Sequence, residues 1–215
     1  MSSILLIGDI VGYGNLGMSV MTPILSHLGY EIYRLPSSMV SNNFSYGKFA
    51  VLDTTDYMRQ CIDIWEEQGF NVDAVCTGYL VSEEQTRIVT DYCRKLKARG
   101  TFIFVDPIMA DDGKLYNGAT DETVAYMRSV CKVADLIVPN VTEAKFLADK
   151  YLDKDDLTSD EAECSNRSSA QDRRDGPPPR WCSKSASVPF GNRSDWWRGH
   201  TDASTCPPNK RLVAH

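Results

Sequence analysis

Three carboxylates gather just after an apolar run in the middle of the chain. The run Phe102–Val105 is followed by Asp106 and Pro107, and Asp111 and Asp112 come within the next six residues. A carboxylate that leaves a buried strand, next to a proline that stiffens the exit, can bind Mg²⁺ and organise phosphate oxygens around it. An Asp-Asp-Gly turn in water, with Asp106 capping the loop, explains the same residues equally well. Spacing alone leaves both interpretations open.

A second polar pair follows the next apolar run. Asn140 and Glu143 stand directly after Val138-Pro139, where a strand is expected to give way to a helix. Ligands of open parallel sheets bind beyond the carboxyl ends of the strands, which is where these side chains should lie. Asn140 as the N-cap and Glu143 as its capping-box partner is the structural interpretation, and it is compatible with a binding role.

Glycines cluster after the first apolar run. Gly12, Gly14 and Gly17 match the dinucleotide-binding pattern G-x-G-x-x-G. That pattern also needs an acidic residue at the end of the second strand, whereas this chain reads Arg34-Leu-Pro-Ser there. A glycine turn that lets strand and helix pack closely is the simpler explanation.

These groups need a sheet to position them, and the first 150 residues supply its pattern. Short apolar runs alternate with amphipathic segments, which is typical of an α/β fold with a parallel sheet flanked by helices. The expected strands are Ile4–Ile10, Glu31–Leu35, Ala74–Tyr79, Thr101–Ile108 and Asp135–Pro139. The expected helices are Leu16–Leu28, interrupted or kinked near Pro23, one that starts at Asp53 or Thr54, one capped by Ser82 and Gln85, and Thr120–Val133.

The alternation of apolar runs and amphipathic segments stops near Cys164. Residues 1–163 carry a net charge of −11, whereas residues 164–215 carry +5 and contain six of the ten prolines and three of the four tryptophans. Only Val188, Phe190, Leu212 and Val213 in this tail come from the set Ile, Leu, Val, Met, Phe and Tyr. We therefore expect one α/β domain over 1–163 and a tail over 164–215 that forms no strand or helix and is disordered or poorly packed. A natural basic arm and an out-of-frame translation product are both possible origins, and the composition favours the second.

Composition also limits location and partners. The N-terminus lacks the basic and apolar regions of a signal peptide, no stretch is long enough to span a membrane, and a cytoplasmic protein is expected. Seven cysteines without a C-x-x-C pair indicate reduced thiols rather than a zinc site or a disulfide framework. The acidic body argues against nucleic-acid binding.

Five motifs in order then carry a family resemblance. They are Gly12-Tyr-Gly, Ser41-Asn-Asn-Phe-Ser-Tyr-Gly, Thr77-Gly-Tyr-Leu, Asp106-Pro-Ile-Met-Ala-Asp and Pro139-Asn-Val-Thr-Glu. Over residues 4–163 the chain resembles pyridoxal/pyridoxamine kinases of the ribokinase-like superfamily. The resemblance implies a three-layer fold with a mostly parallel central sheet, incomplete at the C-terminus, and a homodimer.

The resemblance also implies an activity and a set of site residues. The activity is transfer of the γ-phosphoryl of ATP to the 5′-hydroxymethyl group of pyridoxal, pyridoxine or pyridoxamine, with Mg²⁺, in vitamin B6 salvage. The implied vitamer-binding residues are Asp9, Tyr13, Ser41, Phe44 and Tyr79. The implied ATP-binding residues are Asp106, Asp111, Asn140 and Glu143, of which Asp111 and Glu143 would bind the metal.

The chain departs from the family pattern at three points. Ala110 replaces the usual glycine before Asp111, and Asp9 stands where the family varies between Ser and Asp, which leaves the substrate open. The family's G-T-G-D motif, whose Asp removes the hydroxyl proton, does not occur in these 215 residues. We assign no catalytic residue, since Asp195, Asp202 and Gly199-His200 lack the glycine spacing. A hydroxymethylpyrimidine kinase and a non-catalytic binder of B6 vitamers or nucleotides remain alternatives.

Overall fold

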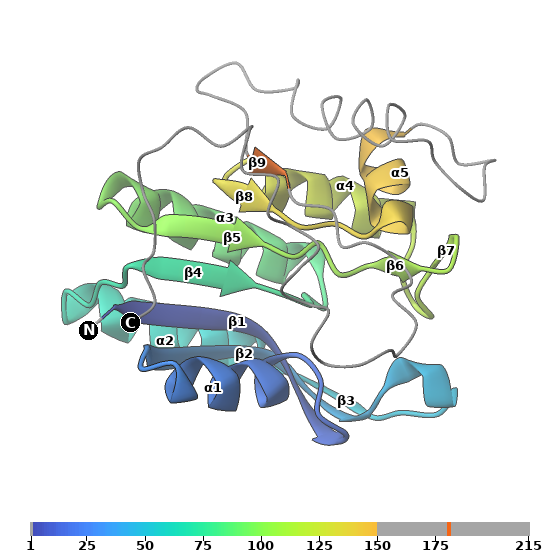
Figure 1. The fold of residues 1–215 in the computed structure, drawn as a ribbon, viewed down its shortest axis with the longest axis horizontal. Coiled ribbons are helices and arrows are strands. Elements are labelled where there is room, and N and C mark those ends of the chain that lie inside the picture. The colour runs from blue at the N-terminus through green and yellow to red at the C-terminus, as the bar shows by residue number, and fades with distance from the viewer. Residues whose placement is uncertain (1, 150–179, 182–215) are drawn as a thin grey trace. The chain divides into compact units, whose positions relative to one another are not determined.

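The computed structural model describes residues 2–149 and 180–181, and these form an α/β fold around one main sheet (Figure 1). The sheet has the strand order β3-β2-β1-β4-β5-β8-β9. Its strands are β1 Ser3–Tyr13, β2 Glu31–Asn42, β3 Val51–Asp53, β4 Ala74–Thr77, β5 Phe102–Val105, β8 Leu136–Ile137 and β9 Arg180–Trp181. All neighbours pair in parallel except β2 and β3, so the expected mostly parallel sheet is confirmed.

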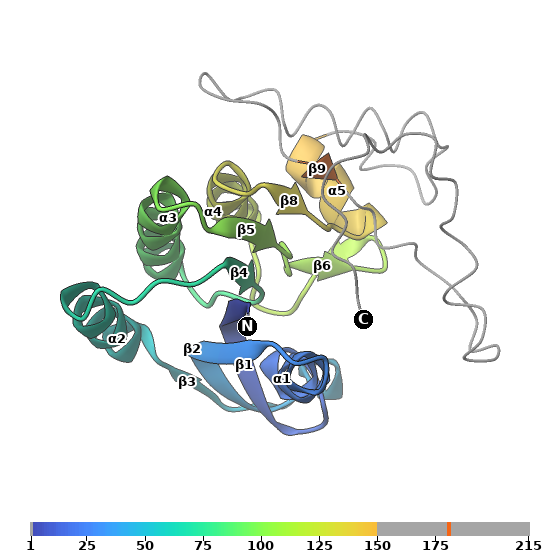
Figure 2. The same ribbon diagram turned by 60° about the vertical axis from the view of Figure 1, so that its left-hand side comes forward.

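Helices cover both faces of the sheet (Figure 2). They are α1 Met18–His27, α2 Thr55–Glu67, α3 Glu83–Ala98, α4 Asp121–Cys131 and α5 Val141–Ala148. Alternate side chains of β1 enter different cores, because successive residues of a strand point to opposite faces. Leu5 and Ile7 belong to the larger core beneath α2, α3 and α4, whereas Ile4 and Leu6 pack with Met18 of α1.

The helix signals in the sequence are confirmed with one exception and one refinement. Helix α1 runs unbroken through Pro23, so the expected interruption is wrong, while the alternative of a kink stays a prediction. The refinement concerns α3, where Ser82 Oγ accepts a hydrogen bond from the Gln85 backbone N–H as a cap should. The Gln85 side chain does not return to Ser82, however, and instead accepts from the backbone N–H of Val81.

Several short elements were not predicted. They are β3, the 3-10 turn Phe44–Tyr46, and a hairpin made by β6 Ala110–Asp111 and β7 Lys114–Leu115. The first two strands also extend past the predicted ends, to Tyr13 and Asn42, because the two strands pair along their whole length. These additions build the loops beside the carboxyl ends of the central strands.

The tail contributes one described element. Arg180–Trp181 pairs in parallel with β8, so the expectation of no strand within 164–215 is wrong at these two residues. Backbone pairing to a free sheet edge requires only N–H and C=O groups, and an unfavourable side-chain composition does not prevent it. The rest of that prediction, including Asp195, Asp202 and Gly199-His200, lies outside the described residues. Among the helices that are described, none is both long and apolar enough to cross a membrane.

Candidate functional site

A cavity of about 650 Å³ lies beyond the carboxyl ends of the central strands. Its walls come from the second half of β1 and the turn that leads into α1, from the end of β2 with the following turn, from the residue after Gly78, and from the segment that runs from Ile108 through the β6–β7 hairpin to Asn117. The lining residues are Asp9, Val11, Leu16, Gly17, Val40, Asn42, Asn43, Phe44, Tyr79, Ile108, Asp111, Asp112, Lys114, Leu115, Tyr116 and Asn117. Four of the predicted site residues, Asp9, Phe44, Tyr79 and Asp111, therefore share one cavity.

Asp9 supplies a buried carboxylate at one end of the cavity. Burial raises the pKa of the Asp9 carboxyl, and its own backbone N–H only partly opposes this effect. The chain folds back over it at Gly17, which bridges to Ile10 with φ of 52°. A Cβ at position 17 would lie 2.7 Å from Asp9 Oδ1, so glycine is required by close approach as well as by conformation.

The glycine motif thus has a packing role in this structure. Gly12 lies inside β1, and Gly14 and Gly17 have positive φ in the turn that leads into α1. These glycines bring the turn against Asp9.

An aromatic wall stands beside Asp9. The rings of Phe44 and Tyr79 lie 5.2 Å apart between centroids, and Phe49 packs edge-on against Phe44 at 4.6 Å. Ser41 Oγ accepts from the Ala50 N–H at 2.8 Å, which closes the loop that carries Phe44. Burial, and then the charges of Tyr126 and Asp9, raise the pKa of the Tyr79 phenol, so Tyr79 is uncharged at neutral pH. A flat heteroaromatic ring fits such a wall.

The β6–β7 hairpin gives the cavity an acidic end. Asp111 and Asp112 line it from the β6–β7 hairpin, whose tip is tied to α5 by the Gly113 N–H donating to Thr142 Oγ1 at 3.0 Å. Burial, followed by the negative charges of Asp111, Glu143, Asp106 and Asp112 in that order, raises the pKa of Tyr116 to about 12. Tyr116 is therefore uncharged at neutral pH.

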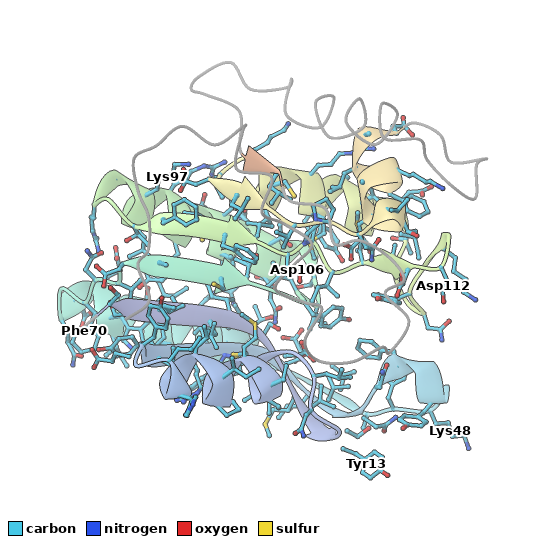
Figure 3. All side chains as sticks on the ribbon, in the orientation of Figure 1. Tyr13, Lys48, Phe70, Lys97, Asp106 and Asp112 are labelled. Carbon is cyan, nitrogen blue, oxygen red and sulfur yellow. The ribbon has the colours of Figure 1, made fainter. Side chains whose placement is uncertain are left out.

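The two interpretations of the Asp-rich loop are both visible. Asp112 and Gly113 have φ of 49° and 77° and form the hairpin turn, and Asp111 Oδ1 accepts from the Asp112 N–H at 3.0 Å. The same turn presents Asp111 and Asp112 to the cavity. Figure 3 marks Asp112 on this hairpin and Asp106 near the carboxyl ends of the central strands.

Asn140 and Glu143 form the expected capping box. Asn140 Oδ1 accepts from the Glu143 N–H, and Glu143 Oε2 accepts from the Asn140 N–H, both at 2.8 Å. Glu143 is buried, and its second oxygen accepts from the Met109 N–H at 3.4 Å. The Asn140 amide donates to the Ala110 carbonyl at 2.8 Å, which fixes the strand before Asp111. Ala110 adopts no positive φ, so an alanine is accommodated where the family resemblance led us to expect glycine.

Two predicted vitamer-binding residues lie outside the cavity lining. Tyr13 is 70% exposed at the tip of β1, edge-on to Tyr46 at 6.2 Å. Ser41 lies at the base of the Phe44 loop, where it also donates to Asn42 Oδ1 at 2.6 Å. Asp106, Asn140 and Glu143 surround the acidic end without lining the cavity. Their roles stay predictions.

Lys114 and Tyr116 line the cavity although sequence reasoning gave neither a role. The signal that could have found them is the Asp-Gly pair at 112–113, which favours a tight hairpin and returns the chain towards the carboxylates.

The described part of the chain holds no group of three or more His, Cys, Asp or Glu side chains with the geometry of a metal site. The donors that are present suit Mg²⁺, which proteins often hold through one or two carboxylates while phosphates and waters complete its octahedron. Asp111 is exposed and lines the cavity, whereas Glu143 is buried and accepts a backbone hydrogen bond on each of its two oxygens.

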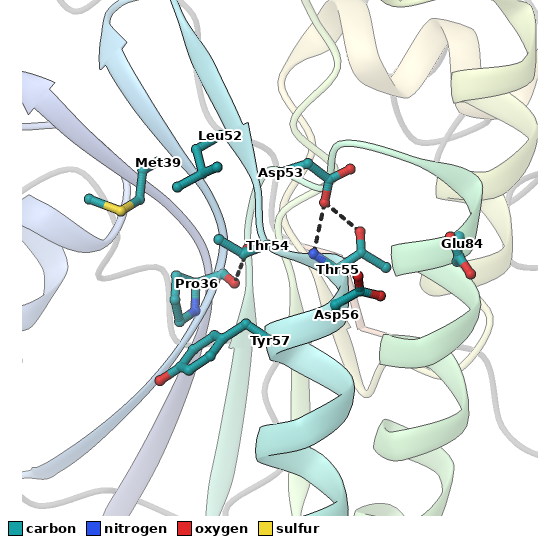
Figure 4. A pocket seen from close by; sticks show the side chains of 9 residues that line it. All are labelled: Pro36, Met39, Leu52, Asp53, Thr54, Thr55, Asp56, Tyr57 and Glu84. Atoms are coloured by element: carbon teal, nitrogen blue, oxygen red, sulfur yellow. Dashed lines mark hydrogen bonds between the residues drawn. The ribbon is translucent and has the colours of Figure 1, made fainter.

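A second cavity, of about 700 Å³, lies at the edge of the sheet around β3 and the start of α2 (Figure 4). Met39, Leu52 and Tyr57 give it an apolar side, and Asp56 and Glu84 an acidic one. None of the predicted site residues lines it.

Comparisons with known proteins point to one family. Residues 29–171 match the model of the phosphomethylpyrimidine kinase family. The chain is 30% identical over 161 residues to a pyridoxal kinase PdxY of Burkholderia lata, a match that covers 71% of this chain and 55% of the relative.

Solved structures point to the same family. A putative phosphomethylpyrimidine kinase from Bacteroides thetaiotaomicron, crystallised with pyridoxal, is 36% identical with a TM-score of 0.73, over 77% of this chain and 58% of that one. Pyridoxal kinase from Lactobacillus plantarum is 28% identical with a TM-score of 0.68, over 79% and 59% respectively. The chain spans about half the length of the curated relatives it matches. Because the family model covers more than half of the sequence, the chain belongs to the phosphomethylpyrimidine kinase family, as a pyridoxal kinase-like member of the ribokinase-like superfamily.

Proposed function

We propose that the cavity binds a vitamin B6 vitamer, and that the site derives from a kinase that phosphorylates the 5′-hydroxymethyl group of pyridoxal, pyridoxine or pyridoxamine. The observation that supports this most is that one cavity holds Asp9, the Phe44–Tyr79 wall and the carboxylates of the β6–β7 hairpin. A ring held against the aromatic wall has its edge near Asp9. A protonated pyridine nitrogen is both a cation and a hydrogen-bond donor, and either property compensates the buried carboxylate.

The acidic end suits the phosphate side of the reaction. In phosphoryl transfer the vitamer hydroxyl oxygen attacks the γ-phosphorus of ATP, the bond from that phosphorus to ADP breaks, and the hydroxyl proton passes to a base. Enzymes promote this step mainly by positioning and by neutralising charge. Bound Mg²⁺ would supply that neutralisation, with Asp111 and Glu143 as its proposed ligands and Asp106 and Asn140 as neighbours of the ATP phosphates.

We identify no general base that could remove the hydroxyl proton. No G-T-G-D motif occurs in its sequence, and among the described residues that line the cavity we assign none to proton removal. General bases typically contribute about 10²- to 10⁴-fold to a rate. We therefore propose that the 215-residue chain binds vitamer with little or no phosphate transfer.

Hydroxymethylpyrimidine kinase is the second candidate, favoured by the description of the matching family. The two functions differ in the ring that the cavity prefers. A ligand that binds only the native state raises thermal stability in proportion to its affinity. Thermal shifts measured with pyridoxine and with the hydroxymethylpyrimidine therefore separate the two candidates.

We further propose a homodimer located in the cytoplasm. Helix α1 and the residues that flank it carry exposed apolar side chains at a spacing of four residues: Val20 and Ile24 in the helix, Leu28 at its C-cap, and Leu16 before it, which also lines the cavity. Contiguous apolar surface of this kind is typical of a protein interface. Ile24→Lys, at a position 54% exposed, should shift the mass measured by light scattering from dimer to monomer.

The direct test measures binding and turnover on the same preparation. Calorimetry should show saturable pyridoxine binding that Tyr79→Ala weakens, while a coupled ADP assay with Mg-ATP shows no turnover above background. Absence of binding would overturn the proposed vitamer site. Turnover at a rate typical of small-molecule kinases, about 1–100 s⁻¹, would overturn the proposed loss of activity.

A further inference from the structure

A buried glutamine connects the vitamer cavity to the elements behind it. Gln85 lies in the first turn of α3 and has no exposed surface. A buried amide must find partners for two N–H groups and one carbonyl oxygen, because each unmet group costs about 1–3 kcal/mol. The partners of Gln85 come from four different segments, so its side chain fixes their relative positions.

Its amide nitrogen donates to three acceptors. They are the Ser37 carbonyl oxygen at 2.6 Å and, at 3.1 Å each, Asp53 Oδ1 and Thr55 Oγ1. Its carbonyl oxygen accepts from the Val81 N–H at 3.0 Å. Asp53 also accepts from the Thr55 N–H and hydroxyl, as the dashed lines of Figure 4 show. Strand β2, strand β3, helix α2 and the segment before α3 thus meet at one side chain.

Ser37 carries this arrangement to the cavity. The β1–β2 register slips at this point, because Gly8 pairs with Pro36 and Asp9 with Ser38, which leaves Ser37 as an extra residue in a bulge. Bulges redirect side chains and are common near functional sites. The fully buried Ser37 hydroxyl donates to the Tyr79 carbonyl at 2.6 Å.

Two hydrogen bonds therefore fix the backbone at Tyr79 and just after it. Ser37 fixes its carbonyl, and Gln85 fixes the backbone two residues later at Val81. The Tyr79 ring forms the cavity wall with Phe44, at 5.2 Å between centroids. We propose that Gln85 is a positioning residue, which acts through Ser37 and Val81 to hold the Tyr79 ring against the bound vitamer. This inference rests on the proposed function.

The first test needs no ligand. In the full chain with isotope-labelled Tyr and Phe, cross-relaxation between the Tyr79 and Phe44 rings reports their contact. Gln85→Met keeps the volume and removes the hydrogen bonds, and it should abolish that cross-peak. Gln60→Met, at an exposed position on α2, is the matched control and should leave it unchanged. An intact cross-peak in folded Gln85→Met overturns the proposal.

The second test is a double-mutant cycle on pyridoxine affinity. Gln85→Met should weaken binding about fivefold in the wild-type background and less than twofold in a Tyr79→Ala background, as coupled residues do. Equal weakening in both backgrounds would show a general structural effect and overturn the proposal. If Gln85→Met does not fold, Ser37→Ala removes only the bond to the Tyr79 carbonyl and should give the same pattern with a smaller effect. If wild-type protein binds no vitamer while the ring contact depends on Gln85, the proposed function fails and the ring-positioning role stands.

Discussion

Asp9→Asn should change stability and ligand binding in opposite directions. The Asp9 carboxyl is 9% exposed, and burial raises its pKa above the ordinary value. A carboxyl with a higher pKa in the folded state than in the unfolded state costs stability when it ionises. That cost is absent below the unfolded-state pKa, grows as the pH rises through the interval between the two values, and is constant above it. Asparagine cannot ionise and avoids the cost.

The sign of the effect follows from this linkage. Because ionisation of a carboxyl with a raised pKa costs stability, the variant should be more stable than wild type at pH 7. At pH 3 the two proteins should differ little. Pyridoxine affinity should meanwhile fall by about ten- to a hundredfold, because a hydrogen bond to a charged group is worth roughly 1.5–3 kcal/mol.

Urea unfolding at pH 3 and pH 7, with calorimetry at pH 7, measures both quantities. Asp63→Asn is the matched control, since Asp63 is exposed on α2, and it should change neither. A less stable Asp9→Asn protein at pH 7, or a stability difference that is the same at both pH values, would refute the reasoning about the buried carboxylate. Unchanged pyridoxine affinity would refute the role of Asp9 in binding.

Three other substitutions have defined outcomes. Phe44→Ala should weaken pyridoxine binding about two- to tenfold by calorimetry, because an aromatic pair contributes about 0.5–1.5 kcal/mol, and an unchanged affinity would remove Phe44 from the wall. Leu96→Ala, at a fully buried core position of α3, should lower the free energy of unfolding by about 2–5 kcal/mol in urea, and a loss below 1 kcal/mol would contradict the core assignment. Asn140→Ala should lower the free energy of unfolding by about 1 kcal/mol, because α5 loses its cap. Thr120→Ala removes the cap of α4 and serves as the control. If Asn140 also lies near phosphate, Asn140→Ala should weaken Mg-ADP binding more than Thr120→Ala does.

The sequence was a good guide wherever local chemistry decides structure. The central strands alternate between two cores and are apolar throughout, so their runs stand out. Caps such as Ser82 and Asn140 hydrogen-bond within their own helices, and a local pattern suffices to predict them. The elements that it missed depend on partners distant in sequence. Strand β3 exists by pairing with β2, and β9 by pairing with β8.

The candidate site also contains residues that a motif predicts and contacts that depend on partners distant in sequence. Asp9, Phe44, Tyr79 and Asp111 were proposed from motifs, and the fold brings them to one cavity. The Gln85 arrangement could not be predicted. The capping pattern expects the Gln85 side-chain oxygen to accept from the Ser82 N–H, whereas it accepts from the Val81 N–H, and the amide nitrogen donates to the Ser37 carbonyl in a bulge 48 residues away. Pairing register, which determines that bulge, is a property of the assembled sheet.

The most direct test of the vitamer site is a titration of the labelled full chain with pyridoxine, followed through the ring resonances of Phe44 and Tyr79. Both rings should shift saturably with one dissociation constant, and the hydroxymethylpyrimidine should shift them more weakly at equal concentration. Rings that do not respond, or a saturable response confined to residues of the second cavity such as Tyr57, would contradict the assignment of the Asp9 cavity as a vitamin B6 site.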